Sequence, residues 1–232
     1  MKMQSALMMA LIMALPAVQA MTLFEAELTC PIGGEKFKQT LAGSGTRFGT
    51  YLDTRPMGPH PAPWPMAKCP GNGYVLFTEH LTDEQRVRLE AIIASADYRR
   101  LAASETNYAL AAYLMTQLAY PSQKVAYVLV QAAWEAADEA QARRYMQEAL
   151  AHYVDALSSP YDRADAWIGD QLLAGELERR LGRFDAARSR FEALLADRRL
   201  PPATPTDIAK YQLDLISRGD TEPHLIPEPK HD

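Results

Sequence analysis

Two short matching segments constrain this chain most: residues 30–34 and 69–73 each read Cys-Pro-x-x-Gly. In small zinc modules a turn of this kind contains a second cysteine, and two such turns point four sulfurs at one metal ion. Here Gly33 and Asn72 stand at the positions where that second cysteine would be. Only one sulfur per turn remains, so the two turns predict a disulfide in place of the metal.

Residues 1–20 have the features of an export signal. Lys2 gives a positive start, an apolar run follows over residues 6–18, and small residues up to Ala20 suit cleavage. The run is too short for a permanent membrane anchor. We therefore expect a periplasmic or secreted chain that begins near Met21, in an oxidising compartment that permits a disulfide. Two alternatives stay open: a translation start at Met21, and two free, buried cysteines in a reducing compartment.

The cysteine count supports the bridge, because Cys30 and Cys69 are the only two cysteines of the chain. Their disulfide would enclose 38 residues, and the entropy of closing such a loop corresponds to about 4 kcal/mol of stabilisation. Zinc would need further ligands. His60 and His80 are near in the sequence, but neither stands at metal-ligand spacing from a cysteine. We expect no metal and no cofactor.

Composition disfavours several classes of partner. The chain has 232 residues, a formal net charge of -5 and a pI near 5.6, so it offers no general basic field to nucleic acid or to an anionic membrane. After the signal, no apolar run reaches membrane-spanning length. We expect no nucleic-acid binding and no membrane span, and the composition leaves the oligomeric state open.

The module around the two cysteines is expected to be small and extended. Five prolines between Arg55 and Pro65 exclude a helix or a central strand. We interpret this run as a stiff connector, with a docking motif for an aromatic groove as the alternative. Strands or arms are expected at residues 21–29, 37–41, 46–51 and 74–77, the middle two as a hairpin around the Gly-Ser-Gly at 43–45.

The sequence changes character at Thr82. Residues 82–85 read Thr-Asp-Glu-Gln, a capping box that starts a helix. From there to Ser217 the chain is rich in Ala, Leu, Glu, Arg and Gln at helical spacing. The expected fold is mainly α: a small β module at residues 21–81, a tetratricopeptide-like helical domain at 82–217 and a flexible tail at 218–232. Helices are expected near residues 83–95, 105–119, 122–137, 139–157, 162–181, 184–197 and 205–217.

One part of the helical region has the spacing of a repeat. Gly175 stands where a partner helix would pack closely, Gly182 shapes a turn, and Ala187 and Phe191 lie on the inner stripe of the next helix. This spacing resembles a tetratricopeptide repeat, in which two antiparallel helices cross at a small residue and an aromatic side chain fills the crossing. A weaker copy runs over residues 127–150.

A set of short matches connects both parts of the chain: Cys30-Pro31, Gly34, Phe37, Asp53, Arg55-Pro56, Cys69-Pro70, Gly73-Tyr74, Ala133-Trp134, and residues 175–177 and 180–182. In these positions the sequence resembles a bacterial group, domain-of-unknown-function family 2225, over about residues 28–196. The resemblance implies paired cysteine knuckles followed by tetratricopeptide-like helices. It departs at Gly33 and Asn72, which is why we interpret the chain as an exported, metal-free relative. The role of the family is undefined, so the resemblance implies an architecture and no activity.

No complete catalytic pattern is present in the sequence. There is no Gly-x-Ser-x-Gly elbow, no Gly-rich phosphate loop before a helix, and no second histidine that would make Glu79-His80 a helical zinc-protease motif. We therefore expect no enzymatic activity. The alternative is a hydrolase acting on envelope material, with its site in the Pro-rich loop near His60, Trp64 and His80.

Stacked helix pairs form an extended groove, which suits a protein or peptide partner. The function we expect is that of an exported adaptor whose partner-binding candidates are Tyr127, Trp134, Trp167 and Gln171. For both tryptophans a core position is the alternative. Arginine pairs recur at residues 99–100, 143–144, 179–180 and 198–199; we interpret them as solvated helix faces, with a groove for an acidic peptide or an anionic glycan as the alternative.

Overall fold

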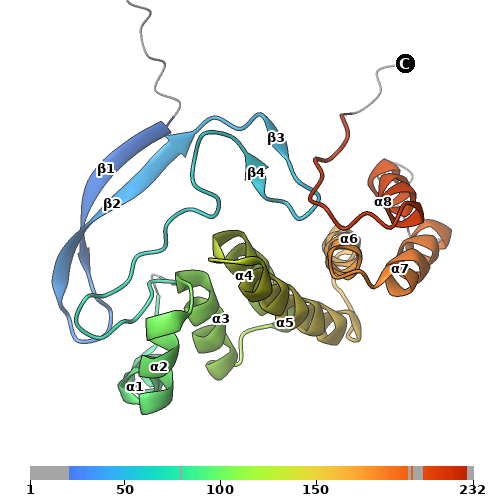
Figure 1. Cartoon of the computed structure of the whole chain (residues 1–232). Coiled ribbons are helices and arrows are strands. Elements are labelled where there is room, and N and C mark those ends of the chain that lie inside the picture. Colours follow the sequence, from blue (N-terminus) through green and yellow to red (C-terminus); the bar gives the residue numbers. More distant parts are fainter. Residues whose placement is uncertain (1–20, 79, 198–199, 201–205, 229–232) are drawn as a thin grey trace, which may run out of the picture.

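The computed structural model describes residues 21–78, 80–197, 200 and 206–228, so the predicted export signal lies outside the described residues. Within them, two small strand pairs precede eight helices, which confirms a mainly α fold with a small N-terminal β module (Figure 1). The strands are β1 (Met21–Thr29), β2 (Lys36–Gly45), β3 (Gly49–Thr50) and β4 (Pro56–Met57). The helices are α1 (Asp83–Ala94), α2 (Ala96–Ser104), α3 (Asn107–Gln117), α4 (Ser122–Glu135), α5 (Glu139–Leu157), α6 (Ala164–Arg180), α7 (Phe184–Ala196) and α8 (Asp207–Ser217).

β1 and β2 form a long antiparallel ribbon that arches beside the helices (Figure 1). The first Cys-Pro-x-x-Gly segment is the turn of this ribbon, and Cys30 N donates to Glu35 O across it at 2.7 Å. The predicted hairpin around residues 43–45 is therefore wrong. Gly43 lies instead within β2, where the register with β1 shifts, and glycine is common at such a bulge because it adapts to the local kink.

The strand expected at residues 74–77 is reduced to a single bridge. Val75 pairs with Lys68 on the other side of the second Cys-Pro-x-x-Gly turn. The strand pairing does not extend to Phe77, because the backbone N–H of Phe77 donates to Val75 O of its own segment at 3.0 Å. The chain then enters α1 at the predicted capping box, in which the Thr82 side chain accepts a hydrogen bond from Gln85 N.

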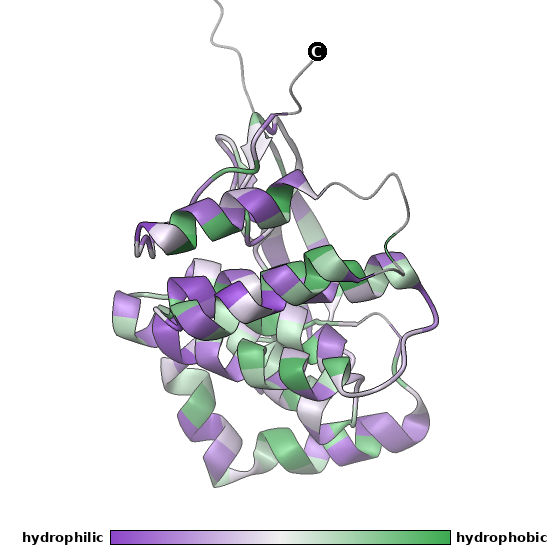
Figure 2. Ribbon diagram, turned by 90° about the vertical axis from the view of Figure 1, so that its right-hand side faces the viewer, coloured by the Kyte–Doolittle hydropathy of each residue, from purple (hydrophilic) through white to green (hydrophobic). Residues whose placement is uncertain are grey.

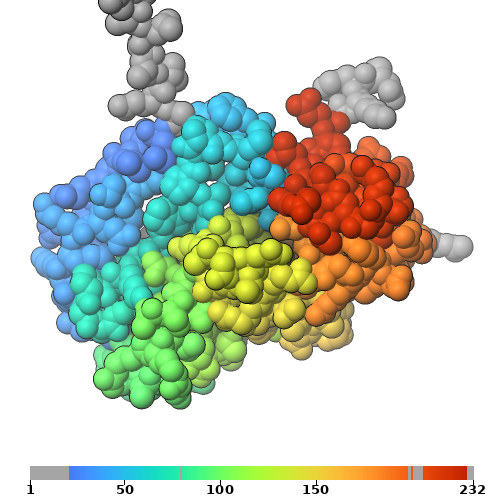
Figure 3. Space-filling view, viewed as in Figure 1, coloured from blue at the N-terminus to red at the C-terminus, as the bar shows by residue number. Residues whose placement is uncertain are grey.

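The C-terminal segment packs on the second strand pair, so residues 218–228 differ from the flexible tail that the sequence predicts. Leu225 forms an antiparallel bridge with Tyr51, and Ile226 N donates to Thr50 O at 2.8 Å. In the space-filling view the N-terminal module and the C-terminal segment lie side by side (Figure 3). The end of the described chain is therefore fixed to its beginning.

A buried polar network explains why this segment is held. Arg179 on α6 has no exposed surface, and its guanidinium donates to Glu176 and to Gln212 on α8, each at 2.8 Å. Its other N–H groups donate to the backbone oxygens of Asp220 at 2.7 Å and Glu222 at 3.0 Å. A buried guanidinium needs this many partners. The interpretation of the arginine pairs as solvated faces is therefore wrong for Arg179.

Most predicted helices are present, but α2 was not predicted. Ser95 ends α1, and its side chain accepts a hydrogen bond from Tyr98 N at 3.1 Å, which starts a new helix at once. A serine is an effective cap because its oxygen satisfies an N–H that the first helical turn leaves open. No helix was predicted from the sequence between residues 95 and 105.

Two helix pairs pack as the repeat spacing predicts: α4 with α5, and α6 with α7. Gly175 of α6 lies directly against Phe191 of α7, since a Cβ at Gly175 would come within 2.3 Å of that ring. Phe191 has no exposed surface. Gly182 in the intervening turn has a φ of +76°, a conformation that glycine adopts without a steric cost.

The apolar core runs through the helices in adjoining clusters, and apolar and polar residues alternate along the helices in Figure 2. One cluster joins the cysteine turns to the first helices, because Tyr74 and Val75 pack with Leu89 of α1 and Leu110 of α3. The N-terminal module is thus part of the same folded unit as the helices. None of the helices in the described part of the chain combines the length and apolar character that crossing a membrane requires.

Candidate functional site

The predicted disulfide is present at the centre of the N-terminal module. Cys30 and Cys69 are bonded, their Cα atoms are 5.8 Å apart, and each residue is 1% exposed. No free cysteine remains in the described residues. The two turns have the same backbone pattern, since Gly34 N donates to Cys30 O at 3.1 Å and Gly73 N to Cys69 O at 2.9 Å. The disulfide therefore joins two turns of the same backbone geometry.

Asn72 fills the space between the two turns. Its Nδ2 donates to Ile32 O at 2.7 Å, and its Oδ1 accepts from Tyr74 N at 2.9 Å. A Cβ at Gly33 would lie 3.7 Å from Asn72 Nδ2, so the two positions that lack cysteine face each other. Throughout the described ranges no group of three His, Cys, Asp or Glu residues could hold a metal ion. The arrangement suits a cross-linked scaffold.

The Pro-rich loop uses His60 for packing. The His60 ring stacks on Trp64 with centroids 5.2 Å apart, and its Nδ1 lies 3.1 Å from Pro61 O. The ring also covers Gly45, where a Cβ would come within 2.9 Å of it. Within the described residues no carboxylate pairs with His60, whereas His80 is exposed on another stretch of the chain. This geometry attaches the loop to the end of β2.

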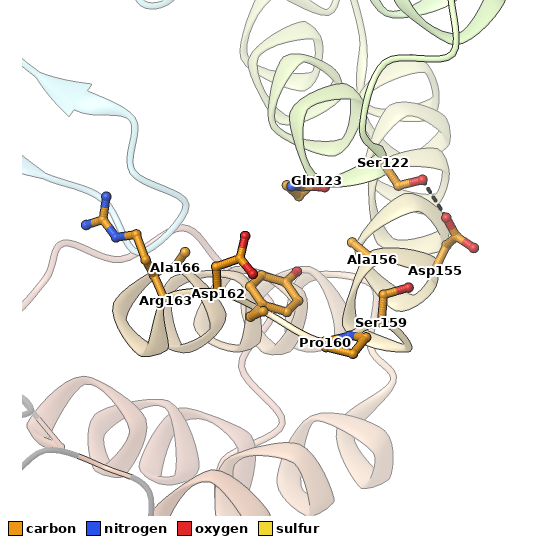
Figure 4. A pocket seen from close by; sticks show the side chains of 10 residues that line it. Ser122, Gln123, Asp155, Ala156, Ser159, Pro160, Asp162, Arg163 and Ala166 are labelled. Atoms are coloured by element: carbon orange, nitrogen blue, oxygen red, sulfur yellow. Dashed lines mark hydrogen bonds between the residues drawn. The ribbon is translucent and has the colours of Figure 1, made fainter.

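A groove follows one face of α6, and it consists of three adjoining hollows of about 370, 570 and 520 Å³. The first lies between the start of α4, the end of α5 and the start of α6 (Figure 4). It shares residues 159–162 with the second hollow, and the second shares Trp167 and Gln171 with the third, which borders α7. We call this continuous surface the α6 groove. Two of the four partner-binding candidates therefore stand at one junction of it.

Hydrogen bonds fix the side chains of the α6 groove. Arg190 donates to both oxygens of Glu178, at 2.8 and 2.7 Å, and to Gln171 Oε1 at 2.7 Å. Tyr161 donates to Asp170 at 2.7 Å; burial raises the pKa of Asp170, and this hydrogen bond opposes the shift. Carboxylates outnumber guanidinium groups along the groove even when Asp197 is left out, because Asp155, Asp162 and Glu178 line it against Arg163 and Arg190.

The other two candidates, Tyr127 and Trp134, lie on α4 beneath the N-terminal module. Their rings meet edge to face with centroids 6.5 Å apart, and Thr54 Oγ1 lies 3.5 Å from the Tyr127 hydroxyl. Thr54 belongs to the loop between β3 and β4, so this loop borders the face of α4 that the sequence analysis assigned to a partner, while Tyr127 itself stays 39% exposed. The four candidates thus belong to two separate places.

A small cavity lies beside Trp134, and we call it the Trp134 cavity. Its volume is about 60 Å³, and it is lined by residues of the β3–β4 loop, α4, α5 and α6. Three N–H groups at its lining, Arg55 Nε, Trp134 Nε1 and Arg180 Nε, are buried and have no hydrogen-bond partner in the described structure. Asp53 and the apolar side chains of Val130, Ala133, Ala142, Met146 and Leu177 complete the lining.

The chain matches the sequence model of a family described as uncharacterized proteins conserved in bacteria, DUF2225, over residues 66–216. This range is more than half of the 232 residues. The chain belongs to domain-of-unknown-function family 2225. No curated protein and no solved structure matches it.

The family 2225 match covers less of the N-terminal module than the sequence resemblance suggested. It contains the second cysteine turn and reaches into α8, but it begins at Met66. The first cysteine turn, Asp53 and Arg55 lie before it. Of the residues around the Trp134 cavity, Trp134 and Arg180 therefore belong to the matched family region, while Arg55 is supplied from outside it.

Sequence reasoning missed the Arg179 network completely. Glu176 and Arg179 are three residues apart, which in a helix usually indicates an exposed ion pair. The third member, Gln212, comes from α8, and nothing in the local sequence connects it to α6. For the Trp134 cavity a signal did exist, because Asp53, Arg55, Trp134 and Arg180 were all among the positions that carried the family resemblance.

Proposed function

We propose that this member of family 2225 is an exported adaptor that binds an extended segment of a protein partner along the α6 groove. The observation that carries the proposal is the continuity of the three hollows, with Trp167 and Gln171 at a junction. An enclosed single pocket is typical of small-molecule sites. A chain of open hollows along a helix suits an extended polypeptide instead.

The dimensions of the groove agree with such a ligand. Its lining residues on α6 run from Arg163 to Glu178, and a helical rise of 1.5 Å per residue makes that about 22 Å. An extended peptide advances about 3.3 Å per residue. The groove therefore accommodates a segment of about six or seven residues.

The chemistry of the lining suggests which segments are preferred. The excess of carboxylates favours a segment with at least one Lys or Arg. Gln171 presents its amide at the junction while its oxygen is held by Arg190, which leaves the Nε2 hydrogens for a backbone carbonyl of the ligand. Trp167 offers an aromatic surface beside it. Polar anchors flanked by an aromatic side chain are common in peptide recognition.

Export rests on two supporting features. The signal-like residues 1–20 precede the described chain, and a buried disulfide closes the N-terminal module, as is usual for proteins of oxidising compartments. Cell fractionation tests this part of the proposal. The full chain is expected in the periplasm or medium with its first residues removed, and a variant without residues 1–20 is expected in the cytoplasm; equal distribution of both would contradict export.

Groove binding is tested with variants that block the hollows without touching the core. Ala166 and Ala193 are exposed residues of the first and third hollows, so A166R and A193R together place two bulky cations in an acidic groove. The control is A91R, on the exposed side of α1. A partner captured from envelope extract by the wild type and by A91R is expected to be lost with A166R/A193R. Equal capture by all three proteins would contradict the α6 groove as the binding site.

A further inference from the structure

We propose that the Trp134 cavity is a binding site for a small carboxylate monoanion, of the size of formate or acetate. This site is separate from the α6 groove and does not depend on the adaptor function. The proposal rests on three converging features of the cavity: its unpartnered donors, its net charge and its volume.

Three buried N–H donors belong to residues that line the cavity. Arg55 Nε, Trp134 Nε1 and Arg180 Nε are all withdrawn from solvent and none has a partner among the described residues. They are supplied by the β3–β4 loop, α4 and α6, so the fold itself brings them to one place. A buried donor without a partner is costly, and one on a charged group more so. Three of them around one cavity indicate an acceptor with several lone pairs.

The charge of the lining identifies that acceptor as an anion. Among the described residues, Arg180 interacts electrostatically with Glu176, but that carboxylate is already paired with Arg179 at 2.8 Å. Asp53 is the acidic residue of the lining; it is 7% exposed, and its Oδ1 accepts from the Arg55 backbone N–H at 3.0 Å. Two guanidinium groups and one carboxylate leave a single positive charge. One monoanion neutralises it, whereas a dianion would reverse the sign beside Asp53.

The guanidinium of Arg55 is held in place before any ligand arrives. Its central carbon lies 4.4 Å from the centroid of the Tyr51 ring, a cation–π contact that limits its motion. Tyr51 is in turn fixed by the bridge to Leu225. A donor that is already oriented binds a carboxylate with less loss of conformational entropy, so the C-terminal segment supports the site indirectly.

The volume restricts the ligand to very few atoms. A cavity of about 60 Å³ holds about four water-sized groups, at roughly 15 Å³ each. Acetate has that many heavy atoms, and its methyl group would meet the apolar lining of Val130, Met146 and Leu177. Waters would satisfy the three donors singly, whereas a carboxylate also balances the net positive charge of the lining.

The test uses the chain from Met21 onward with its disulfide intact. Titration with sodium acetate at constant ionic strength, with chloride as the balancing anion, is followed by the indole N–H signals in a nitrogen–proton correlation spectrum. The expected result is a saturable shift of one of the three indole signals, the one that W134F removes. No saturable shift of that signal, or the same shift in chloride alone, would overturn the proposal.

Variants and other anions identify the site and the ligand class. R180M keeps the aliphatic stem of Arg180 and is expected to weaken acetate binding about tenfold or more; the control R183M changes an exposed arginine just after α6 and is expected to bind as the wild type does. Formate is expected to bind, and butyrate and sulfate to bind at least about tenfold more weakly. Equal affinity for sulfate or butyrate, or unchanged affinity in R180M, would overturn a small-carboxylate site. If R180M does not fold, the wild-type titration and the anion series still show whether the cavity binds a small carboxylate.

Discussion

Asn72 has a structural role at the centre of the N-terminal module. Its amide nitrogen donates to Ile32 O of the first cysteine turn, and its amide oxygen accepts from Tyr74 N within the second turn. An amide does this well because it donates and accepts at once. The disulfide and this amide together occupy the space between the turns.

The first prediction concerns this amide. Asn72→Ala removes both hydrogen bonds and leaves Ile32 O and Tyr74 N without their partner, so the free energy of unfolding is expected to fall by about 1–3 kcal/mol. Urea unfolding without reductant measures the change. Gln123→Ala, at an exposed amide of α4, is the matched control and is expected to change stability by less than about 0.5 kcal/mol. Equal effects of the two substitutions would show that the amide does not join the turns.

The second prediction concerns the pH dependence of Glu176. Burial raises the pKa of this carboxyl, and Arg179 and Gln212 oppose the shift only in part. The folded state therefore binds a proton more tightly than the unfolded chain does at this group. Its contribution to stability is full below the ordinary Glu pKa of 4.5 and is lost as the pH rises through the raised pKa.

Glu176→Gln removes this titration. The stability of the wild type relative to E176Q is expected to decrease between pH 4.5 and neutrality, measured by urea unfolding at each pH. A difference that stays constant over this range, or that grows with pH, would mean that the pKa of Glu176 is not raised in the folded protein.

At the scale of elements, the α6–α7 crossing depends on the absence of a side chain at Gly175. The closest approach of a Cβ to Phe191 would be 2.3 Å, and a fully buried ring has little room to move. Gly169 lies on the same helix, but a Cβ there would meet nothing within 4 Å. The two glycines therefore allow the effect of an added methyl group to be compared at an open and at a tightly packed position of the same helix.

The third prediction uses that comparison. Gly169→Ala is expected to stabilise the protein by about 0.5–1 kcal/mol, because alanine has the better helix propensity. Gly175→Ala is expected to destabilise it by about 1–3 kcal/mol in spite of the same gain, because the core becomes overpacked. Thermal unfolding of both variants measures the difference, and the same sign for both would contradict the tight crossing.

The fourth prediction concerns the element formed by the two bridged turns. The folded protein is expected to show no free thiol before reduction and two after reduction under denaturing conditions. Loss of the bridge in a C30A/C69A variant is expected to lower the free energy of unfolding by about 2–5 kcal/mol. Thiol titration and urea unfolding measure these quantities. Two reactive thiols in the unreduced protein would exclude the bridge.

Helices were predicted well where apolar residues recur with a helical period. They were predicted less well where a single residue determines where one helix ends and the next begins. The repeat spacing around Gly175 identified α6 and α7. Ser95, in contrast, ends one helix and caps the next, and a periodic pattern does not reveal this. The hairpin was misplaced because the Gly-Ser-Gly near Gly43 is a usual turn signal, whereas the first cysteine turn already connects β1 to β2. Both segments are able to form a turn, and tertiary contacts determine which of them connects two strands.

The candidate site was predicted only in part, for a similar reason. Trp167 and Gln171 were named as partner-binding candidates, and the structure places both at the junction of two hollows, one helical turn apart on α6. That Trp134 is covered by the β3–β4 loop, and that Arg179 joins α8 to the C-terminal segment, depends on contacts between residues far apart in the chain. No periodicity or local motif encodes such contacts.

At the scale of the whole molecule, the C-terminal segment connects three parts of the fold. It accepts hydrogen bonds from Arg179 on α6 and pairs with the chain at Tyr51. The C-terminal segment thus connects the helical region to the N-terminal module.

The fifth prediction tests this connection. Truncation after Gly219 removes two hydrogen bonds of a buried guanidinium together with the pairing at Tyr51, and is expected to cost about 3–5 kcal/mol. Truncation after Glu228 keeps every described contact and is the control, with an expected change below about 0.5 kcal/mol. Urea unfolding measures both. If the two truncations have the same stability, the segment does not contribute to the fold.

The pairing of Leu225 with Tyr51 has a further consequence for how the protein unfolds. Arrays of stacked helix pairs usually lose structure progressively from a free terminal repeat, because each repeat contacts only its neighbours. Here the last described residues pair with the N-terminal module, so within the described part of the chain the final helices are tied back to its beginning. Opening any one helix pair strains this connection, and the molecule should exchange its amide hydrogens as one cooperative unit.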